Sequence, residues 1–367
     1  MAGLNKTPLY EEHVRLGAKI VEFAGWLMPV YYSNVVEEHI NVRQKAGIFD
    51  ICHMGEFIIE GKDSSSFIQK LITNDLDILE DGKAFYSCMC LENGGIIDDL
   101  FVYRFNKNRF MLVVNAININ KDFGWLMKHK DFFEDASIIN KTEGMAKLDL
   151  QGPNSEGILQ KLTDFELGKL KRFHFVEGNV GKSPAIISRT GYTAEDGFEL
   201  YFDGRKAVDL WRKLLDAGKE FDLKPIGLGA RDTLRIEAGY SLYGHELTEG
   251  ITPFEADIAF VAKLDKGNFI GSEALSSQKN NLKRKIFTFE MIDRGIPRQG
   301  YDIFGDGEKI GFVTSGTFSP TFKKTIGMAM INLNGMKAGD EISIKIRDNF
   351  YLAKIVNKPV YNFHGKV

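Results

Sequence analysis

The chain has 367 residues, more than one hydrophobic core usually serves, so two or three domains are expected. Its net charge of −3, with lysine and arginine spread along the chain, leaves no basic stripe and argues against nucleic acid or an anionic membrane as a partner. No stretch approaches the ~20 consecutive apolar residues that cross a bilayer, and the N-terminal residues have the pattern of neither a signal peptide nor a transit peptide. A cytoplasmic location is therefore expected.

The first part of the chain alternates between helical and strand patterns. Helical spacing appears at 9–16, at Val35, His39 and Val42, and at Phe67, Ile68, Leu71 and Ile72. Gly47 is expected to end the second of these helices, and Asp63 to cap the third. Between them, residues 48–60 alternate apolar and polar side chains and predict one strand, which ends at Gly61.

Three cysteines, Cys52, Cys88 and Cys90, make an odd number in a large chain, which favours reduced thiols over a disulfide framework. With His53 beside Cys52 there are four potential soft ligands, but their spacing matches no common zinc pattern. Buried, inert thiols are therefore favoured over a metal site.

A hairpin is expected around residues 93–104, which read NGGIIDDLFVYR. The glycine turn joins two runs rich in β-branched and aromatic residues, 83–90 and 95–104, and a third strand is expected at 110–115. All three strands should therefore lie in one neighbourhood.

The two acids of this hairpin, Asp98 and Asp99, should point to opposite faces because side chains alternate along a strand. A carboxylate among apolar neighbours is costly to bury unless something donates a hydrogen bond to it, and a cationic or N–H-bearing substrate would do so. The simpler alternative is a solvated acid pair at the start of a strand.

The middle of the chain continues the alternation. Helical spacing is seen at 121–133, 154–162 and 205–217, and buried strands are expected at 144–151 and 185–188. A glycine-rich bend then opens a further helix at 227–240. The lone G-x-G in this bend lacks the spacing of a dinucleotide fingerprint or a phosphate loop, so it does not indicate nucleotide binding.

Residues 276–283 (SSQKNNLK) are polar and predict an exposed linker that separates 1–275 from 284–367. Beyond it, short alternating runs are divided by turns at Asp306-Gly307 and Asp348-Asn349, with no convincing helix. This pattern predicts an all-β, barrel or jelly-roll-like domain. The chain as a whole is expected to be a multi-domain α+β protein with mixed antiparallel sheets and helices.

Residues 189–200 (RTGYTAEDGFEL) form a polar, glycine-flanked segment that could present Tyr192 and Glu199 to a pocket. A half-buried Glu199 could accept two parallel hydrogen bonds from an N–H pair, although an acid on a strand commonly faces water. Arg231 could bind a carboxylate, but a local salt bridge with Asp232 or Glu237 is favoured from the residues alone.

Other side chains from the strands around Asp99 could line the same pocket. Met54, Tyr86 and Asn115 would form a slot that tolerates aromatic groups, unless they are ordinary core residues. His53, among apolar residues, is expected to be a hydrogen-bonded core histidine rather than a base.

Many ordered segments of the chain resemble the aminomethyltransferase, or T-protein, family of the glycine cleavage system. They include TPLYEEHVRLGAK, EFAGWLMP, GIFDICHMGEF, YSCMCLENGGIIDDLFVY, LVVNA, LQGPNS, SRTGYTAEDGFEL, GLGARDTLRIEAGY, LYGHEL and TSGTFSPT. The chain departs from the family at Ile51-Cys52, where Val-Ser is common, and at Ala194, where glycine is usual. Neither departure removes a candidate functional group.

The resemblance implies transfer of an aminomethyl group from the dihydrolipoyl arm of H-protein to tetrahydrofolate, with release of ammonia and formation of 5,10-methylenetetrahydrofolate. By position in the motifs, Asp99 matches the family's catalytic aspartate, Glu199 the carboxylate that binds the pteridine, and Arg231 a ligand-binding arginine. Positioning and electrostatics are favoured over proton abstraction by Asp99, because an aspartate with an ordinary pKa of about 3.9 is a weak base near neutrality.

The resemblance further implies that Tyr86, Tyr103, Asn115, Met54 and Tyr192 line a folate pocket, and that three domains pack around a central folate channel. Two alternatives are a folate-dependent demethylase of the same superfamily and a non-enzymatic folate-binding factor of iron–sulfur assembly. The second would need a cysteine signature late in the chain, and no cysteine follows Cys90.

Overall fold

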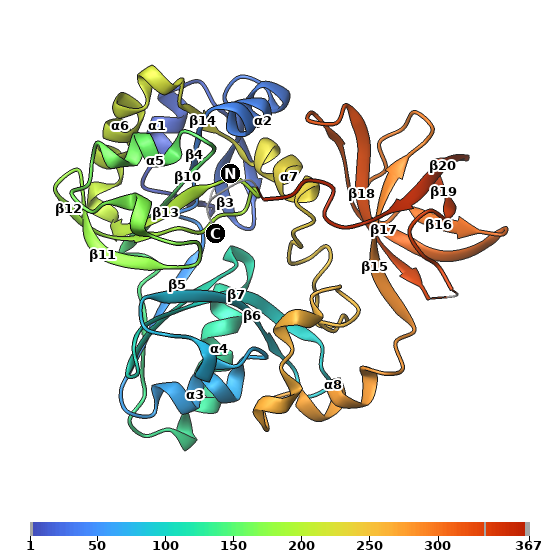
Figure 1. Cartoon of the computed structure of the whole chain (residues 1–367), viewed down its shortest axis with the longest axis horizontal. Helices are drawn as coiled ribbons and strands as arrows, with labels where there is room; N and C mark the ends of the chain where they lie inside the picture. Colours follow the sequence, from blue (N-terminus) through green and yellow to red (C-terminus); the bar gives the residue numbers. More distant parts are fainter. Residues whose placement is uncertain (1–2, 334, 364–367) are drawn as a thin grey trace.

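The computed structural model describes residues 3–333 and 335–363. Its strands form a three-stranded, a five-stranded and a six-stranded sheet and a closed six-stranded barrel (Figure 1). This arrangement confirms the predicted α+β class with an all-β barrel near the C-terminal end. None of the helices in the described part of the chain combines the length and the apolar character needed to span a bilayer.

The lobe at the top left of Figure 1, called the upper lobe here, is built on the six-stranded sheet, in the order β11-β12-β13-β10-β4-β14. Its strands are β4 (Gly47–Asp50), β10 (Met145–Gln151), β11 (Phe175–Val180), β12 (Ser183–Ser188), β13 (Gly197–Asp203) and β14 (Lys224–Ile226). Helices α1 (Tyr10–Arg15), α2 (Val35–Gln44), α5 (Ser155–Gln160) and α6 (Ala207–Ala217) belong to this lobe, as does a small sheet of β1 (Asn5–Lys6), β2 (Lys19–Phe23) and β3 (Trp26–Tyr31). Trp211 of α6 is fully buried in its core.

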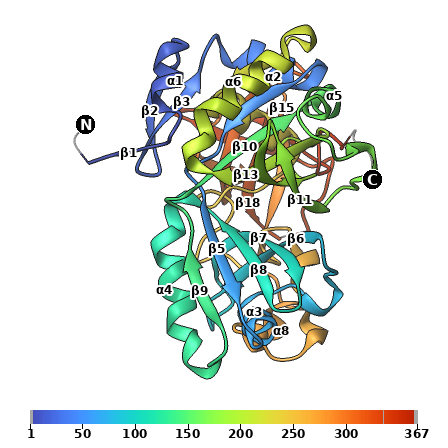
Figure 2. The ribbon, with the colours of Figure 1, turned by 90° about the vertical axis from the view of Figure 1, so that its left-hand side faces the viewer.

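The lower lobe contains the five-stranded antiparallel sheet, in the order β6-β7-β8-β5-β9 (Figure 2). Its elements are β5 (Gly55–Glu60), β6 (Lys83–Cys90), β7 (Ile96–Asn106), β8 (Arg109–Val114), β9 (Ser137–Asn140), α3 (Ser64–Leu71) and α4 (Ile119–His129). The predicted hairpin is β6–β7, in which Cys88 faces Asp99, and β8 is the predicted third strand. Asp63 is the residue before α3, but its side chain makes no cap hydrogen bond to the helix.

The prediction of one strand over 48–60 is wrong, because this segment forms β4 and β5 in two different sheets. The Asp50 carboxylate accepts a hydrogen bond from the Cys52 backbone N–H at 2.9 Å, and the Met54 N–H bonds to the Ile51 carbonyl, so the chain turns between the strands. Gly47 also does not end the preceding helix, which stops at Gln44. Gly47 begins β4, where a Cβ atom would lie 2.4 Å from the Ile226 side chain.

The third part of the molecule, at the right of Figure 1, is the barrel. Its strands are β15 (Arg284–Met291), β16 (Asp302–Gly305), β17 (Glu308–Ser319), β18 (Lys324–Asn332), β19 (Glu341–Ile346) and β20 (Asn349–Val356). The predicted turn at Asp306-Gly307 joins β16 to β17. The first residues of the expected linker are instead the last turn of α8 (Ser272–Gln278).

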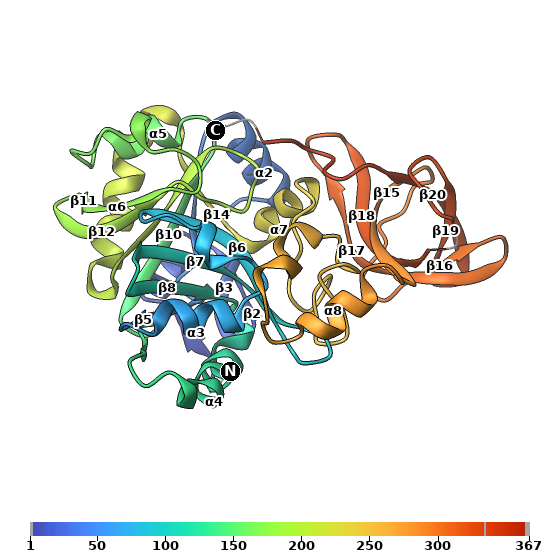
Figure 3. The ribbon, with the colours of Figure 1, turned by 60° about the horizontal axis from the view of Figure 1, so that its bottom comes forward.

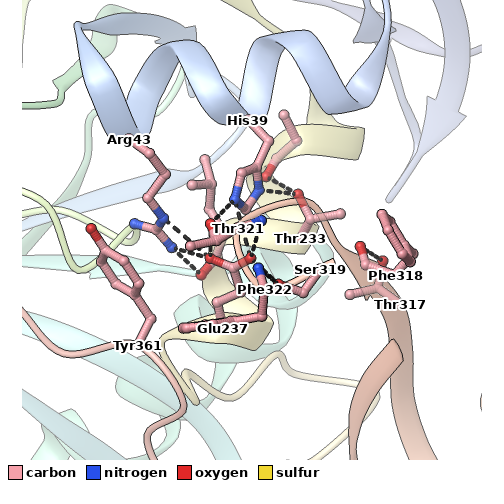
Figure 4. A network of polar contacts seen from close by, with 12 residues as sticks. His39, Arg43, Thr233, Glu237, Thr317, Phe318, Ser319, Thr321, Phe322 and Tyr361 are labelled. Carbon is pink, nitrogen blue, oxygen red and sulfur yellow. Dashed lines mark hydrogen bonds and ion pairs between the residues drawn. The ribbon is translucent and has the colours of Figure 1, made fainter. Parts of the chain in front are cut away.

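Helix α7 (Leu228–Glu237) lies between the lobes and the barrel (Figures 1 and 3). A buried polar network ties it to α2 and to the loop after β17 (Figure 4). Glu237 accepts hydrogen bonds from Arg43 Nη2 and from Thr321 Oγ1, each at 2.9 Å. His39 Nε2 lies 3.2 Å from the same carboxylate, and the Tyr361 ring covers the Arg43 guanidinium at 3.7 Å. Side chains from three other segments therefore fix α7 in place.

Candidate functional site

A central cavity of about 1090 Å³ lies between the two lobes. Its wall comes from β2, β3, β6 to β8, β10, β13 and α7, from the loop 238–245, and from Lys358 and Pro359 after the barrel. Among the described residues, none of the barrel strands contributes to this wall. Seven of the eight candidate residues line the cavity: Met54, Tyr86, Asp99, Asn115, Tyr192, Glu199 and Arg231.

Asp99 reaches the cavity from β7, and its carboxylate is held from two sides. Tyr86 Oη donates to Oδ2 at 2.9 Å, and Asn115 Nδ2 donates to Oδ1 at 2.8 Å. Burial and the neighbouring charge of Asp98 raise the pKa of Asp99 to about 7. Asp99 can therefore both accept and release a proton near neutrality.

Asp98 points the opposite way, as strand alternation requires, and is fully buried beneath α4. Its carboxylate accepts hydrogen bonds from Asn115 N at 3.0 Å, Asn115 Nδ2 at 2.8 Å and Asn118 Nδ2 at 2.7 Å, and it contacts Asp122. Burial and the charge of Asp98 raise the pKa of Asp122 to about 11, so Asp122 keeps its proton. The Asn115 amide bonds to both Asp98 and Asp99 and so sets their relative orientation.

Glu199 enters the cavity wall from β13, directly opposite Asp149 on β10. Its Oε2 atom accepts a hydrogen bond from Thr190 Oγ1 at 2.6 Å, and Lys147 Nζ lies 3.3 Å from Oε1. Although burial disfavours the charge, the Lys147 ammonium and the Thr190 hydroxyl lower the pKa of Glu199. Glu199 is therefore an ionised, hydrogen-bond-accepting group at neutral pH.

Tyr103 lies behind this wall rather than on it. Its side chain is fully buried, and its hydroxyl donates to Glu199 Oε2 at 3.3 Å and bonds to the Tyr201 hydroxyl at 2.8 Å. The structure thus differs from the expectation that Tyr103 lines the pocket. Tyr103 holds Glu199 in position from the rear.

Arg231 comes from the first turns of α7, but neither local acid is its partner. Arg231 Nη1 donates to Asp149 Oδ2 at 3.1 Å, whereas Asp232 pairs with Arg235 and Glu237 pairs with Arg43. The predicted local salt bridge is therefore wrong, because helix α7 turns Arg231 toward β10. The guanidinium also covers the ring of Tyr192 at 4.7 Å, and the Tyr192 hydroxyl donates to the Ser241 carbonyl.

Comparison with known proteins decides the family. A family model described as "GCVT N-terminal domain" matches residues 9–266, and one described as "Glycine cleavage T-protein C-terminal barrel domain" matches residues 284–362. The chain belongs to the glycine cleavage T-protein family.

Individual members of the T-protein family match along nearly the whole chain. An aminomethyltransferase of Caldanaerobacter subterraneus subsp. tengcongensis is 51% identical over 365 residues, which cover 99% of this chain and 97% of that protein. One of Halalkalibacterium halodurans is 47% identical over 363 residues, or 98% and 99% of the two chains. The crystal structure of glycine cleavage system aminomethyltransferase T from Bartonella henselae superposes with a TM-score of 0.93 at 34% identity and covers 99% of this chain and 100% of that one.

Three ionisable groups of this chain were not predicted from the sequence: Lys147, Asp149 and Glu56. Burial and the charge of Glu199 raise the pKa of Asp149 to about 7, and burial raises the pKa of Glu56 to about 8. A signal was present, because Lys147, Asp149 and Gln151 alternate along the predicted buried strand and so share one face. Three polar groups on one face of a buried strand indicate a polar cavity or a network.

His53 also differs from its prediction. It is buried, as expected, but its Nδ1 atom has no hydrogen-bond partner among the described residues. His53 also lines the cavity, with its ring 5.7 Å from that of Phe23. Burial lowers the pKa of His53 to about 4, so the imidazole is neutral. The three cysteines are free and buried as predicted, and the described residues contain no cluster of three or more metal-ligating side chains.

Ala194 keeps the bend at which the T-protein family usually has glycine. Its φ of 61° lies in the left-handed region, which alanine adopts at a cost of about 1 kcal/mol. The segment that carries Tyr192 is thus preserved, with some strain, in this member of the family.

Proposed function

We propose that this aminomethyltransferase takes its aminomethyl group from the dihydrolipoyl arm of H-protein and transfers it to tetrahydrofolate. The products are 5,10-methylenetetrahydrofolate and ammonia. The observation that carries the proposal is the pairing, in one cavity, of an ionised Glu199 with an Asp99 whose pKa is raised to about 7. The first group suits an N–H-rich ring, and the second suits proton transfer beside a developing cation.

Asp99 has two tasks in this proposal. Its charge stabilises the cationic carbon that develops during transfer, and it accepts a proton from a folate nitrogen as that nitrogen bonds to the carbon. Overall, the two N–H hydrogens of tetrahydrofolate end on ammonia and on the lipoyl thiol. The raised pKa supports proton acceptance in addition to the positioning role favoured from the sequence.

The remaining candidate residues bind and orient. Glu199 accepts hydrogen bonds from the pteridine, Tyr86 and Asn115 fix Asp99, and Met54 and Tyr192 contact the ring system. Arg231, with one N–H on Asp149, has guanidinium N–H groups that could bind a ligand carboxylate.

Several broader expectations belong to the same proposal. The chain would divide into a folate-binding region, 1–275, and a barrel domain, 284–367, of which residues 1–2, 334 and 364–367 lie outside the described residues. Lipoylated H-protein would be its macromolecular partner, and the cytoplasm its location.

The test is formation of 5,10-methylenetetrahydrofolate and ammonia from aminomethylated H-protein and tetrahydrofolate. Wild type should form both products, Asp99→Ala should lose at least ~100-fold in turnover, and Asp216→Ala, at an exposed ion pair, should be unchanged. A normal rate for Asp99→Ala would remove Asp99 from its role. No product from a wild type that still binds tetrahydrofolate would favour a methyl donor instead, as in the demethylase alternative.

A further inference from the structure

Lys147 is a buried cation that faces the proposed folate cavity. Its side chain is 3% exposed, and it lies on β10 opposite Tyr201, one alternation from the Asp149–Glu199 pair. Lys147, Asp149 and Glu199 therefore share the face of the sheet that lines or adjoins the cavity. A buried ammonium at such a place needs hydrogen-bond acceptors.

The contacts of the Lys147 ammonium leave donor capacity unused. Nζ lies 3.3 Å from Glu199 Oε1, 3.7 Å from the weak acceptor Met54 Sδ, and 4.9 Å from the centre of the Tyr201 ring. An ammonium group has three N–H bonds, and among the described residues Glu199 Oε1 is the one strong acceptor near them. Because Lys147 lines the cavity, a ligand bound there could accept a hydrogen bond from a second N–H of the ammonium.

The two oxygens of Glu199 are unequally occupied. Oε2 is surrounded by the hydroxyls of Thr190 at 2.6 Å and of Tyr103 and Tyr201 at 3.3 Å each. Oε1 has Lys147 alone among the described contacts. Glu199 Oε1 can thus accept a further hydrogen bond from a ligand, and Lys147 Nζ beside it can donate one.

We propose that Lys147 and Glu199 together bind the cyclic-amide edge of the pteridine, with Glu199 Oε1 accepting the ring N–H and Lys147 donating to the adjacent carbonyl oxygen. This inference rests on the proposed function, because it names how that cavity selects its ligand. Lys147 is then a specificity-determining residue, and more than a counter-ion for Glu199. The other ionisable neighbours do not compete for this ligand edge, since Asp149 pairs with Arg231 and Glu56 has a raised pKa that keeps it neutral at pH 7.

The experiment compares tetrahydrofolate with its 4-amino-4-deoxy counterpart by calorimetric titration. Replacing the carbonyl oxygen by an amino group turns the acceptor into a donor and removes the ring N–H, so the analogue opposes both Lys147 and Glu199. Wild type should bind tetrahydrofolate roughly 10- to 100-fold more tightly, the range of a charge-assisted hydrogen bond. In Lys147→Met this ratio should fall by the part that the contact with the carbonyl oxygen contributes, mainly through weaker binding of tetrahydrofolate, while Glu199 keeps the preference for the ring N–H.

Control variants separate recognition from structure. Lys147→Arg should keep much of the preference, and Lys219→Met, at an exposed lysine, should keep all of it. If Lys147→Met does not fold because Glu199 loses its counter-ion, the ratio is measured in Lys147→Met/Glu199→Gln against Glu199→Gln alone. The same fall is then expected, because the lysine is the group that distinguishes oxygen from amine.

An unchanged ratio in the foldable lysine variant would overturn the role of Lys147 while leaving the proposed function intact. Failure of wild type to bind tetrahydrofolate at all would instead overturn the proposed function. The two failures are therefore distinguishable.

Discussion

Asp98 and Asp99 are neighbours in sequence, yet β7 gives them different environments. Asp98 lies beneath α4 against Asp122, whereas Asp99 faces the cavity with Tyr86 and Asn115 as donors. Two carboxylates so close together repel each other, and this repulsion, added to burial, raises the proton affinity of Asp99.

The raised pKa of Asp99 predicts the pH dependence of catalysis. If the ionised form is required, kcat/KM should fall about tenfold per pH unit below pH ~7, where the carboxylate becomes protonated. A pH profile with saturating H-protein measures this fall. A flat profile between pH 5.5 and 8 would contradict proton acceptance by Asp99.

The raised pKa of Asp99 also predicts that ionisation of this carboxyl, which the proposed catalysis requires, lowers the stability of the folded protein. Because the pKa is about 7 in the folded chain and about 4 in the unfolded chain, folding is penalised increasingly as pH rises from about 4 to about 7, and by a constant amount above that. Asp99→Asn should therefore raise the free energy of unfolding by ~1–3 kcal/mol at pH 8 and by little at pH 4. Urea unfolding at both pH values is the measurement, and an equal change at both would refute the assignment.

At the scale of elements, the β6–β7 hairpin is held by the glycine of its turn. A Cβ atom at Gly95 would lie 1.8 Å from the Glu249 carbonyl oxygen, and the next residue, Ile96, donates to the carbonyls of Thr248 and Ile251. The turn that leads to Asp99 is thereby joined to the loop 248–251.

Gly95→Ala should lower the free energy of unfolding by ~2 kcal/mol or more and reduce activity, because the loop 248–251 must move away. Gly124→Ala is the matched control, since Gly124 lies in α4 and, in the part of the chain that the structure describes, no atom outside its own helix turn lies within 4 Å of the added methyl. It should stabilise by ~0.5–1 kcal/mol. Thermal unfolding of both variants distinguishes close packing from the general cost of replacing a glycine.

The network around Glu237 joins α2, α7 and the barrel. Glu237→Gln should cost ~2–4 kcal/mol, because the buried Arg43 loses one of its two carboxylate partners. Asp216→Asn, at an exposed pair with Lys219, should change stability by less than ~0.5 kcal/mol. Equal losses of unfolding free energy in chemical denaturation would mean that the buried Arg43–Glu237 pair contributes no more than an exposed ion pair.

Elements with strong local signals were predictable from the sequence. The hairpin and the barrel follow from glycine turns and alternation, as at Asn93-Gly94-Gly95 and Asp306-Gly307. The turn between β4 and β5 was not, because the Asp50 carboxylate makes it and no glycine or proline lies within its residues 51–54. Alternation along 48–60 continues through the turn, so it cannot tell one strand from two.

The cavity could not be predicted from the sequence patterns, because segments that are far apart in the sequence form it. Asp149 and Arg231 are 82 positions apart, and no local pattern pairs them. The resemblance identified Asp99, Glu199 and Arg231 as candidates. The positions of Lys147 and Tyr103 beside Glu199 depend instead on the register of β10 and β13 and on the packing of the two lobes.

At the scale of the whole molecule, ligand binding should stabilise the lobes more than the barrel. Tetrahydrofolate at 100 times its Kd adds about 2.7 kcal/mol. Amide hydrogen exchange should slow in β7, β13 and the loop 238–245, which line the cavity, and change little in β16 and β19. Equal protection of the barrel would mean that it unfolds together with the lobes.

The breadth of the cavity wall affects how this protein is made. The wall includes Val21 and Pro359, so it draws on segments that leave the ribosome far apart in time. Both lobes and the barrel can emerge before Lys358 and Pro359 reach their places. A nascent chain would therefore lack a complete cavity until Lys358 and Pro359 have been added, and the complete cavity could not act as a template for earlier steps of folding.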